Sequence, residues 1–596
     1  MCGIAGWFGR STDCEAGALL EALRHRGPDG EGFWRDPDGR ALLVNTRLAI
    51  LDPSPAGAQP MSCIVSNRDG AEMRIVFNGA IYNFRELRRE LEAEGETFSG
   101  ESDTEVMLRL LARDGPAALP RLAGMFAFAL YDSQSGHALL GRDPFGIKPL
   151  YYAEGDGTLA FASEVKALRE CLTVGTVSSP AALRDTLVWG SVPEPSTVVD
   201  GVRTLPAGCF LEWDGTSARI ARWHHIEFRD SSPPLNAATA TRAALLESVQ
   251  RHLVSDVPLG IFLSGGMDST AILALTRESL GRNADIRTFS IGFADAAYDE
   301  SAIARRTAAH FGATHTEWKM SAAEVRDQTA GYVAAMDQPT IDGLNTLSIS
   351  KLARTHGVKV AFSGLGGDEM FGGYGSFRNI PRLVRMHSFL GPLRSVAAAA
   401  LDRARPGSRW RRLAEFFDGD GGSLSAFHAQ RGIFTEAEAR ELVRGLTGDD
   451  PGPADWSFGA LPADLRDTAS LLEITRYMRN QLLRDSDVFS MASGVELRVP
   501  FVDARLFDAI SAIPAEVRLE RGKQLLFDAV PEIPVWVREQ PKRGFMFPYE
   551  LLSDEFAEMA ADQRATVPMV TWYRRWAFAA VANAAEQIPR PAPAIL

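Results

Sequence analysis

The sequence is poor in cysteine and has no CxxC pair. Its 596 residues include five cysteines, an odd and scattered set. This pattern argues against a zinc or disulfide framework, so we expect reduced thiols. The five positions are Cys2, Cys14, Cys63, Cys171 and Cys209.

Long apolar runs and an excess of positive charge are also missing. No stretch is apolar enough to cross a bilayer, and the first residues lack the apolar core of a signal peptide. The formal net charge of −13 argues against nucleic acid or an anionic membrane as the main partner. We therefore expect a cytoplasmic protein that acts on small molecules. Any phosphate site must be built locally from backbone amides, a few cations and a metal.

The chain is too long for one hydrophobic core, so we expect at least two domains. Short β-rich runs separated by turns continue to about Trp223 and predict a layered α+β domain. The polar stretch 229–237 is the candidate linker. After it, strand, glycine loop and helix repeat, which predicts a parallel sheet covered by helices with ligands at the carboxyl ends of its strands. The remainder, from about Tyr374, is predicted to be mostly helical.

Cys2 follows the initiator methionine directly. If Met1 is removed, Cys2 carries both a thiol nucleophile and a free α-amino group that can take the thiol's proton. A chance cysteine in a frayed terminus is the alternative. The apolar residues from Gly3 to Gly6 favour a terminus buried in a sheet.

Two glycine loops carry the second candidate site. The loop from Ser264 to Ser269 lies between a buried strand and a helix, where backbone amides and the helix N-terminus favour an anion. No lysine follows its glycines, which excludes a Walker loop. Asp268 and Asp368, one in each loop, could hold Mg²⁺ against a pyrophosphate. Glycine turns with N-capping aspartates explain either loop alone about as well, but are less convincing for both.

Together with other motifs, these residues resemble the glutamine-dependent asparagine synthetases over nearly the whole chain. The motifs are Met1-Cys2-Gly3-Ile4, Arg24-His25-Arg26-Gly27-Pro28-Asp29-Gly30, Phe77-Asn78-Gly79-Ala80-Ile81-Tyr82-Asn83, Ser102-Asp103-Thr104-Glu105, Arg142-Asp143-Pro144-Phe145-Gly146, both glycine loops, and Glu496-Leu497-Arg498-Val499-Pro500-Phe501.

The resemblance implies an N-terminal nucleophile (Ntn) hydrolase sandwich of αββα layers over residues 1–228, the glutaminase domain. It implies an α/β, Rossmann-like ATP-pyrophosphatase domain with a helical C-terminal region over residues 238–596. ATP, with Mg²⁺, would be cut between its α- and β-phosphates to activate a carboxylic acid such as aspartate. Ammonia from glutamine would then form the amide. The resemblance also allows a homodimer.

The resemblance also implies roles for individual residues. Cys2 would attack glutamine, and Asn78 with Gly79 would form the oxyanion hole. Arg47 and Asp103, with Asn78, would bind glutamine; a surface ion pair is the alternative for the first two. Lys542 would be catalytic in the synthetase site, and Asp268 and Asp368 would bind the metal. ATP would be bound by Leu263, Ser264, Gly265, Gly266, Asp268, Ser269, Ile291, Ser363, Gly364 and Lys523.

Three positions depart from the family's pattern. Leu365 stands where a glutamate is usual, Asp342 where an arginine is usual, and Ala80 where a glutamate is usual. A charge reversal at Asp342 should repel a substrate carboxylate. Either aspartate is bound by other residues, or the acceptor is a different carboxylic acid and the donor a modified glutamine.

Two further classes remain as alternatives. A regulatory protein with degenerate sites is disfavoured by intact Cys2, Asn78, Asp268 and Asp368. An intramolecular amide-forming cyclase would have no use for a working Cys2 with an Asn78-Gly79 pair.

Overall fold

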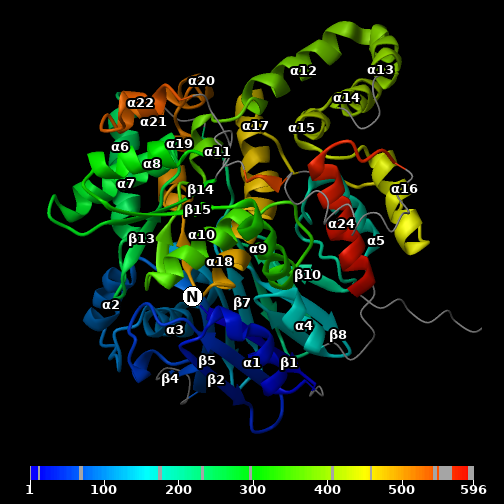
Figure 1. Cartoon of the computed structure of the whole chain (residues 1–596). Coiled ribbons are helices and arrows are strands. Elements are labelled where there is room, and N and C mark those ends of the chain that lie inside the picture. Colours follow the sequence, from blue (N-terminus) through cyan, green and yellow to red (C-terminus); the bar gives the residue numbers. More distant parts are fainter. Residues whose placement is uncertain are drawn as a thin grey trace, which may run out of the picture.

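The computed structural model describes residues 2–10, 14–65, 71–171, 178–229, 234–293, 299–403, 409–456, 459–540, 547–549 and 567–587. In the N-terminal half, two antiparallel six-stranded sheets stack face to face (Figure 1). Their strand orders are β10-β8-β9-β1-β3-β2 and β12-β11-β7-β6-β5-β4. The bounds are β1 (Cys2–Gly9), β2 (Gly30–Arg35), β3 (Ala41–Arg47), β4 (Met61–Val65), β5 (Ala71–Ile81), β6 (Gly124–Asp132), β7 (Ala138–Arg142), β8 (Tyr151–Gly155), β9 (Thr158–Ala162), β10 (Val202–Thr204), β11 (Cys209–Trp213) and β12 (Ala218–Arg222).

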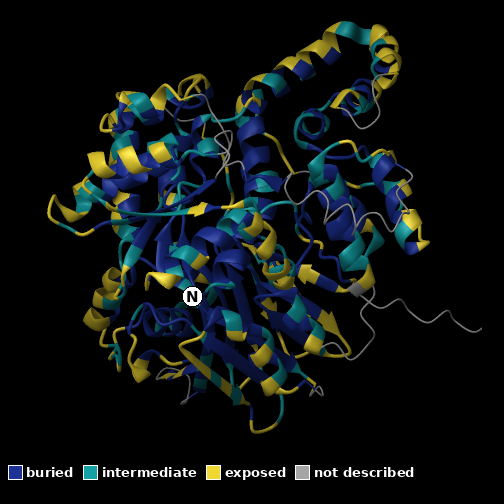
Figure 2. Cartoon of the chain, in the orientation of Figure 1, coloured by how far each residue is buried: buried dark blue, intermediate teal, exposed yellow. Residues whose placement is uncertain are grey.

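Strand β1 shows why these layers form. Its side chains alternate: Ile4 and Phe8 pack between the sheets, while Ala5 and Trp7 pack against helices on the outer face. Both faces of the strand are therefore buried, which is why it is apolar throughout (Figure 2). Helices α1 (Ala16–Leu23), α4 (Val165–Cys171) and α5 (Pro180–Trp189) cover this sheet, and α2 (Phe84–Ala93) and α3 (Asp103–Asp114) cover the other. The predicted αββα sandwich is confirmed.

The second half is built on a five-stranded parallel sheet of order β15-β14-β13-β16-β17. The strands are β13 (Leu259–Phe262), β14 (Arg287–Phe293), β15 (Thr314–Met320), β16 (Val360–Phe362) and β17 (Glu496–Arg498). The strand order reverses between β13 and β16, so the chain leaves these neighbouring strands in opposite directions. That divergence creates a crevice at their carboxyl ends. Both glycine loops begin there, as predicted.

Helices cover both faces of the parallel sheet. One face is packed by α6 (Ala237–His252), α7 (Met267–Leu280), α8 (Ser301–His310), α19 (Ala504–Ser511) and α21 (Gln524–Ala529). The other is packed by α9 (Ala322–Ala335), α10 (Leu344–Thr355) and α18 (Arg484–Met491). The short helices α11 (Gly367–Phe371), α20 (Ala515–Arg518) and α22 (Val535–Arg538) complete this part. The predicted α/β architecture is confirmed.

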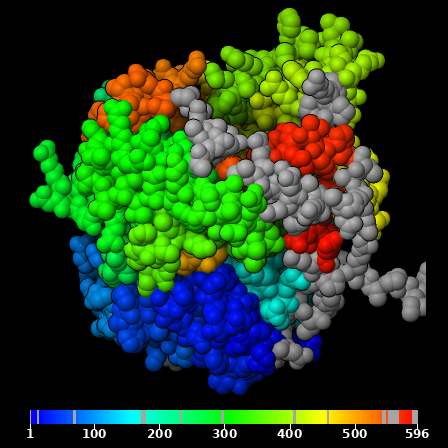
Figure 3. Space-filling view, viewed as in Figure 1, coloured from blue at the N-terminus to red at the C-terminus, as the bar shows by residue number. Residues whose placement is uncertain are grey.

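The helical region lies beside the second sheet. It comprises α12 (Ser376–Leu390), α13 (Arg394–Asp402), α14 (Arg409–Asp418), α15 (Ser423–Arg431), α16 (Glu436–Thr447), α17 (Leu465–Leu472), the π-helical stretch η5 (Glu473–Leu483) and α24 (Trp572–Gln587). The short 3₁₀ turns are η1 (Arg24–Arg26), η2 (Pro55–Gly57), η3 (Gly115–Arg121) and η4 (Gly391–Leu393). Helices α16 and α24 share an apolar core with α5 of the N-terminal half, and the two halves meet along a broad front (Figure 3).

The region from about Tyr374 is mostly helical, as predicted, and the three-residue strand β17 lies within it and pairs with β16. One expectation fails. Cys14 is disulfide-bonded, whereas Cys2, Cys63 and Cys209 are free, since spacing along the chain does not reveal which cysteines meet. Part of the expected linker, residues 230–233, lies outside the described residues, and α6 begins just after it. No helix in the described ranges is long and apolar enough to cross a membrane.

Candidate active sites

The backbone of Cys2 is held at the start of β1, opposite Arg47 of β3. Cys2 is buried, with 7% of its surface exposed, and its nitrogen donates a 3.1 Å hydrogen bond to Oδ1 of Asn78 on β5. This nitrogen becomes the free α-amine once Met1 is removed. Asn78 is therefore placed to orient the amine that would accept the thiol's proton.

The other end of the Asn78 side chain is a free donor. Asn78 is fully buried, and its Nδ2 finds no acceptor among the described residues. A buried N–H without an acceptor is costly, and is expected where a ligand oxygen takes that place. Next to it, a Cβ on Gly79 would lie 2.1 Å from the carbonyl oxygen of Met125, so only glycine fits. Both observations suit the predicted oxyanion hole.

Cys2 lines a cavity that spans about 380 Å³ with open solvent included, and Arg47, Gly79, Ala80 and Asp103 line it too. Nη1 of Arg47 donates to the carbonyl of Ser54 at 3.0 Å, which fixes the guanidinium. The two residues predicted to bind glutamine are thus brought together with the nucleophile. Ala80 leaves its part of the wall apolar.

Asp103 is buried at the start of α3 and accepts a 2.9 Å hydrogen bond from the Ile81 nitrogen. Burial raises the pKa of Asp103 to about 6, against the opposing effect of the Ile81 N–H. No ion pair joins Asp103 to Arg47 among the described contacts, so the surface ion pair considered as an alternative is not formed. The two opposite charges are separate, as a ligand with an ammonium and a carboxylate requires.

Glu496 completes the wall of this cavity from β17 of the second half. Its Oε1 lies 2.5 Å from Nε of Arg498, and both side chains are buried. Burial opposes ionisation, but the charge of Arg498 dominates and the pKa of Glu496 falls to about 2. Sequence reasoning did not assign Glu496 to the glutaminase site, although it opens one of the motifs.

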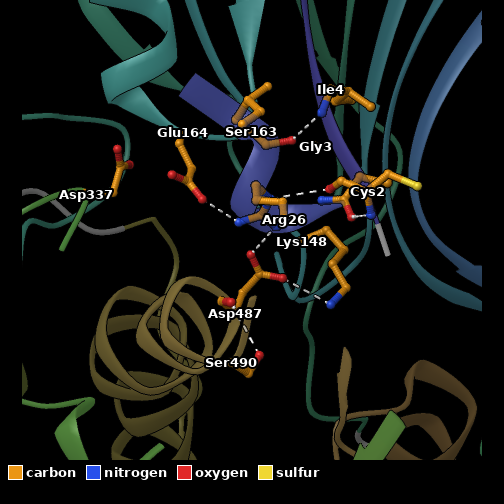
Figure 4. Close-up of polar contacts among 12 residues, drawn as sticks. Cys2, Gly3, Ile4, Arg26, Lys148, Ser163, Glu164, Asp337, Asp487 and Ser490 are labelled. Atoms are coloured by element: carbon orange, nitrogen blue, oxygen red, sulfur yellow. Dashed lines mark hydrogen bonds and ion pairs between the residues drawn. The ribbon is translucent and has the colours of Figure 1, made fainter. Parts of the chain in front are cut away.

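A buried charge network lies behind Cys2 (Figure 4). Nε of Arg26 donates to the Cys2 carbonyl at 3.3 Å, and Nη1 and Nη2 bind Glu164 at 2.8 Å and Asp487 at 2.6 Å. Nζ of Lys148 reaches the other oxygen of Asp487 at 3.1 Å. Because Asp487 belongs to α18, this network ties the nucleophile's strand to the second half.

The first glycine loop is packed directly against the second. The hydroxyls of Ser264 and Ser269 lie 3.0 Å apart, and Ser269 donates to the Gly266 carbonyl at 3.2 Å. A Cβ on Gly364 would lie 2.7 Å from the Ser269 nitrogen, and one on Gly367 would lie 2.4 Å from Oδ1 of Asp268. Side chains at these glycines would separate the loops. Leu263, Gly265 and Ser363 line the same cavity, which spans about 3580 Å³ with the open solvent at its mouth included.

Asp268 and Asp368 meet on either side of Lys523. Nζ of Lys523 lies 2.6 Å from Oδ1 and 2.5 Å from Oδ2 of Asp268, and it also pairs with Asp368. Burial lowers the pKa of Lys523, but the two carboxylates outweigh burial and raise it. Two carboxylates beside a loop predicted to bind phosphate match the donor set that Mg²⁺ uses together with substrate phosphates. The residues therefore fit the predicted metal.

Of the residues predicted for the synthetase site, one lies in the core and another lies outside the described residues. Ile291 is buried in the core that α9 and α10 form and is not among the described residues of the cavity wall. Lys542 lies outside the described residues. Its role stays a prediction.

Comparisons with known proteins agree with this geometry. Residues 1–224 match the family model of a glutamine amidotransferase domain and residues 240–587 that of asparagine synthase. The chain is 32% identical to asparagine synthetase [glutamine-hydrolyzing] 1 of Bacillus subtilis, over 88% of this chain and 82% of the relative. It is 33% identical to a putative asparagine synthetase of Mycobacterium bovis over 94% and 91%, and 33% identical to asparagine synthetase B of Escherichia coli over 65% and 67%.

The fold and both sites therefore define an ATP-dependent, glutamine-hydrolysing carbon–nitrogen ligase. The chain belongs to the asparagine synthase family.

Proposed function

We propose that this enzyme hydrolyses glutamine at Cys2 and uses the ammonia to amidate a carboxylic acid, with aspartate as the first candidate. The acid is activated by ATP as an acyl-adenylate with release of pyrophosphate, and ammonia then displaces AMP. Each turnover converts glutamine, ATP, water and the acid into glutamate, AMP, pyrophosphate and the amide.

The observation that carries this proposal is the contact between Cys2 and Asn78. The Asn78 carbonyl oxygen binds the nitrogen that becomes the catalytic base, and its Nδ2 stays free for the oxyanion. A cyclase without glutaminase activity has no need for this arrangement. In the second site, Ser264, Gly265, Gly266 and Ser269 would hold the phosphates, since the loop amides lie at the N-terminus of α7.

Asp268 and Asp368 would hold the metal, and the metal would supply positive charge to balance the phosphates of ATP. The chain's own contribution is to hold both carboxylates at one place through the contact of the two loops. Lys523 keeps them together by pairing with both.

The test is a product assay with Mg²⁺-ATP, glutamine and aspartate in which AMP, glutamate and asparagine are followed by mass spectrometry. We expect the three products to appear in step. Glutamate without AMP or asparagine would contradict aspartate as the acceptor.

A second candidate is a carboxylic acid other than aspartate. Leu365, which lines the synthetase cavity where a glutamate is usual, favours it. In that case another acid would release AMP in the same assay when aspartate does not.

A further inference from the structure

Part of the synthetase cavity wall is formed by residues that have no role in the site described above. Arg431 at the end of α15, Tyr477 of η5 and Asp342 just before α10 all line this part of the wall, in the same cavity as both glycine loops. A π-helical stretch such as η5 often marks a functional site. This wall lies within one cavity with the phosphate loops, so a molecule bound on it can reach them.

The guanidinium of Arg431 is held in place by its neighbours, and one of its nitrogens, Nη1, is left for a ligand. The guanidinium lies between the rings of Tyr374 and Tyr477, 4.1 and 3.9 Å from their centres. Nε lies 3.1 and 3.0 Å from the carboxylate oxygens of buried Glu473, and Nη2 lies 2.8 Å from one of them. No residue in the described ranges accepts a hydrogen bond from Nη1. An arginine fixed in this way can offer that nitrogen to a carboxylate at little entropic cost.

Tyr374 links this arginine to the second glycine loop. The Tyr374 hydroxyl donates to Oε1 of Glu369 at 2.8 Å, one residue beyond Asp368. The position of Arg431 is thus set relative to the loop that would hold the metal.

Asp342 carries a negative charge that no described cation neutralises. Its Oδ1 accepts from the Gly343 nitrogen at 2.8 Å, and no lysine or arginine in the described ranges forms an ion pair with it. Burial raises its pKa, as expected for a carboxylate that lacks a cation. By contrast, Asp485 on the same wall pairs with Arg484 at 3.1 Å.

Tyr477 is near both groups: Arg431 lies 3.9 Å from the centre of its ring, and burial and the charge of Asp342 raise the pKa of its hydroxyl. Its hydroxyl is close enough to both Arg431 and Asp342 for each to affect its pKa. An unneutralised carboxylate and an available guanidinium nitrogen thus lie near one ring, as two separate anchors for a zwitterion.

We infer that Arg431 binds the α-carboxylate, and Asp342 the α-ammonium, of an amino-acid acceptor whose side-chain carboxylate points to the glycine loops. This inference rests on the proposed function and names the residues that select its acceptor. It accounts for the acidic residue at position 342: the charge attracts the ammonium of aspartate and does not face its carboxylate. Aspartate would then be bound by residues other than those usual in the family.

The test compares aspartate with two acids, each of which lacks one group of aspartate. Succinate is aspartate without the ammonium, and β-alanine is aspartate without the α-carboxylate. AMP release is measured with ammonium as nitrogen donor, so that the glutaminase site does not contribute. The wild type should prefer aspartate to both analogues by about 10- to 100-fold in kcat/KM, the usual effect of losing a hydrogen bond to a charged group.

Two substitutions should each remove one preference. Asp342→Asn keeps an acceptor for the Gly343 nitrogen and should lower kcat/KM for aspartate, mainly through KM, while succinate is unaffected. Arg431→Gln should lower kcat/KM for aspartate and spare β-alanine. Arg378→Gln, at another arginine of the same cavity wall, is the matched control and should change neither preference.

The outcomes separate the inference from the proposed function. Equal use of aspartate and succinate by the wild type, or an Asp342→Asn variant that loses both acids alike, would overturn the inference and leave the proposed function standing. If none of the three acids released AMP, both the inference and aspartate as acceptor would be overturned, and only the second candidate of the proposed function would stand. Unchanged melting temperatures and unchanged KM for ATP would show that the variants fold; if Arg431→Gln fails to fold, Arg431→Lys replaces it.

Discussion

The glutaminase and synthetase cavities differ in size and in the state of their polar groups. With the open solvent at their mouths included, the first spans about 380 Å³ and the second about 3580 Å³. In the first, protein groups already hold Cys2, Arg47 and Asp103 in place, and Nδ2 of Asn78 is left unpartnered. In the second, like charges at Asp268 and Asp368 are brought together and depend on Lys523. The polar groups of the small cavity are therefore already in place for one substrate, whereas the charges of the large cavity are fully balanced only when its ligands bind.

Cys2→Ala should have the largest effect and should separate the activities of the two sites completely. Without the thiolate no glutamine is hydrolysed, so glutamine-dependent synthesis should be lost while ammonium still supports it. AMP and amide formation with each nitrogen source would be measured by mass spectrometry, which should also show Met1 removed from the wild type. Cys63→Ala, at a buried free thiol on β4, is the control and should keep both activities. Equal loss with ammonium would show that the sites are not separable.

Asp368→Asn should act on the large cavity alone. Losing one of two metal-binding carboxylates removes several kcal/mol of charge stabilisation, so AMP release should fall about 1000-fold. Glutaminase activity, measured as glutamate release, should persist. Unchanged AMP formation would refute the metal assignment.

Asn78→Ala should act on the small cavity alone. It removes the free Nδ2 donor, and glutamine hydrolysis should slow by about 10²- to 10³-fold, as for other oxyanion-hole donors. Ammonium-dependent amide formation serves as the internal control. A fall in that activity as well would mean that Asn78 supports the fold more than the oxyanion.

Asp487→Asn tests the contact between the two cavities. It leaves Arg26 and Lys148 buried with a neutral partner, and breaking a buried ion pair typically costs about 3–5 kcal/mol of unfolding free energy. Thermal unfolding of the whole chain would show the loss. Asp450→Asn, in an exposed pair with Arg444, should leave the melting temperature unchanged, and an equally small effect at Asp487 would contradict the role of the buried network.

The smallest expected effect is a pH dependence of glutamine binding. The pKa of Asp103 is about 6, raised by burial, so its carboxylate is charged above that pH and becomes protonated below it. KM for glutamine should therefore rise about tenfold per pH unit below 6. Asp103→Asn should have a high KM without this inflection. An inflection that persists in the variant would assign the titration to another group.

The individual sites were predictable to the extent that their motifs are local. The loop at Gly265 and Gly266 is a strand–turn–helix element, and its sequence predicted its place in the sheet; its phosphate ligand stays a prediction. Cys2 and Asn78 were assigned through motifs in the same way. Ile291 was assigned through the resemblance alone, and its side chain lies in the core.

Contacts between distant segments were not predictable. Glu496 closes the glutaminase cavity from the other half, and Arg26 meets Asp487 across 461 positions. No hydrophobic period and no motif spacing in the sequence indicates either of these contacts.

The sequence by itself determined the fold class of both halves and the place of the two glycine loops, because glycine geometry and strand–loop–helix order are local constraints; it also predicted Cys2 as the nucleophile. Only the tertiary structure decided that Lys523 stands between Asp268 and Asp368, and that Arg431 and Asp342 share a cavity wall. The physical reason is that burial and charge pairing depend on which elements pack together, and that packing is a property of the whole chain.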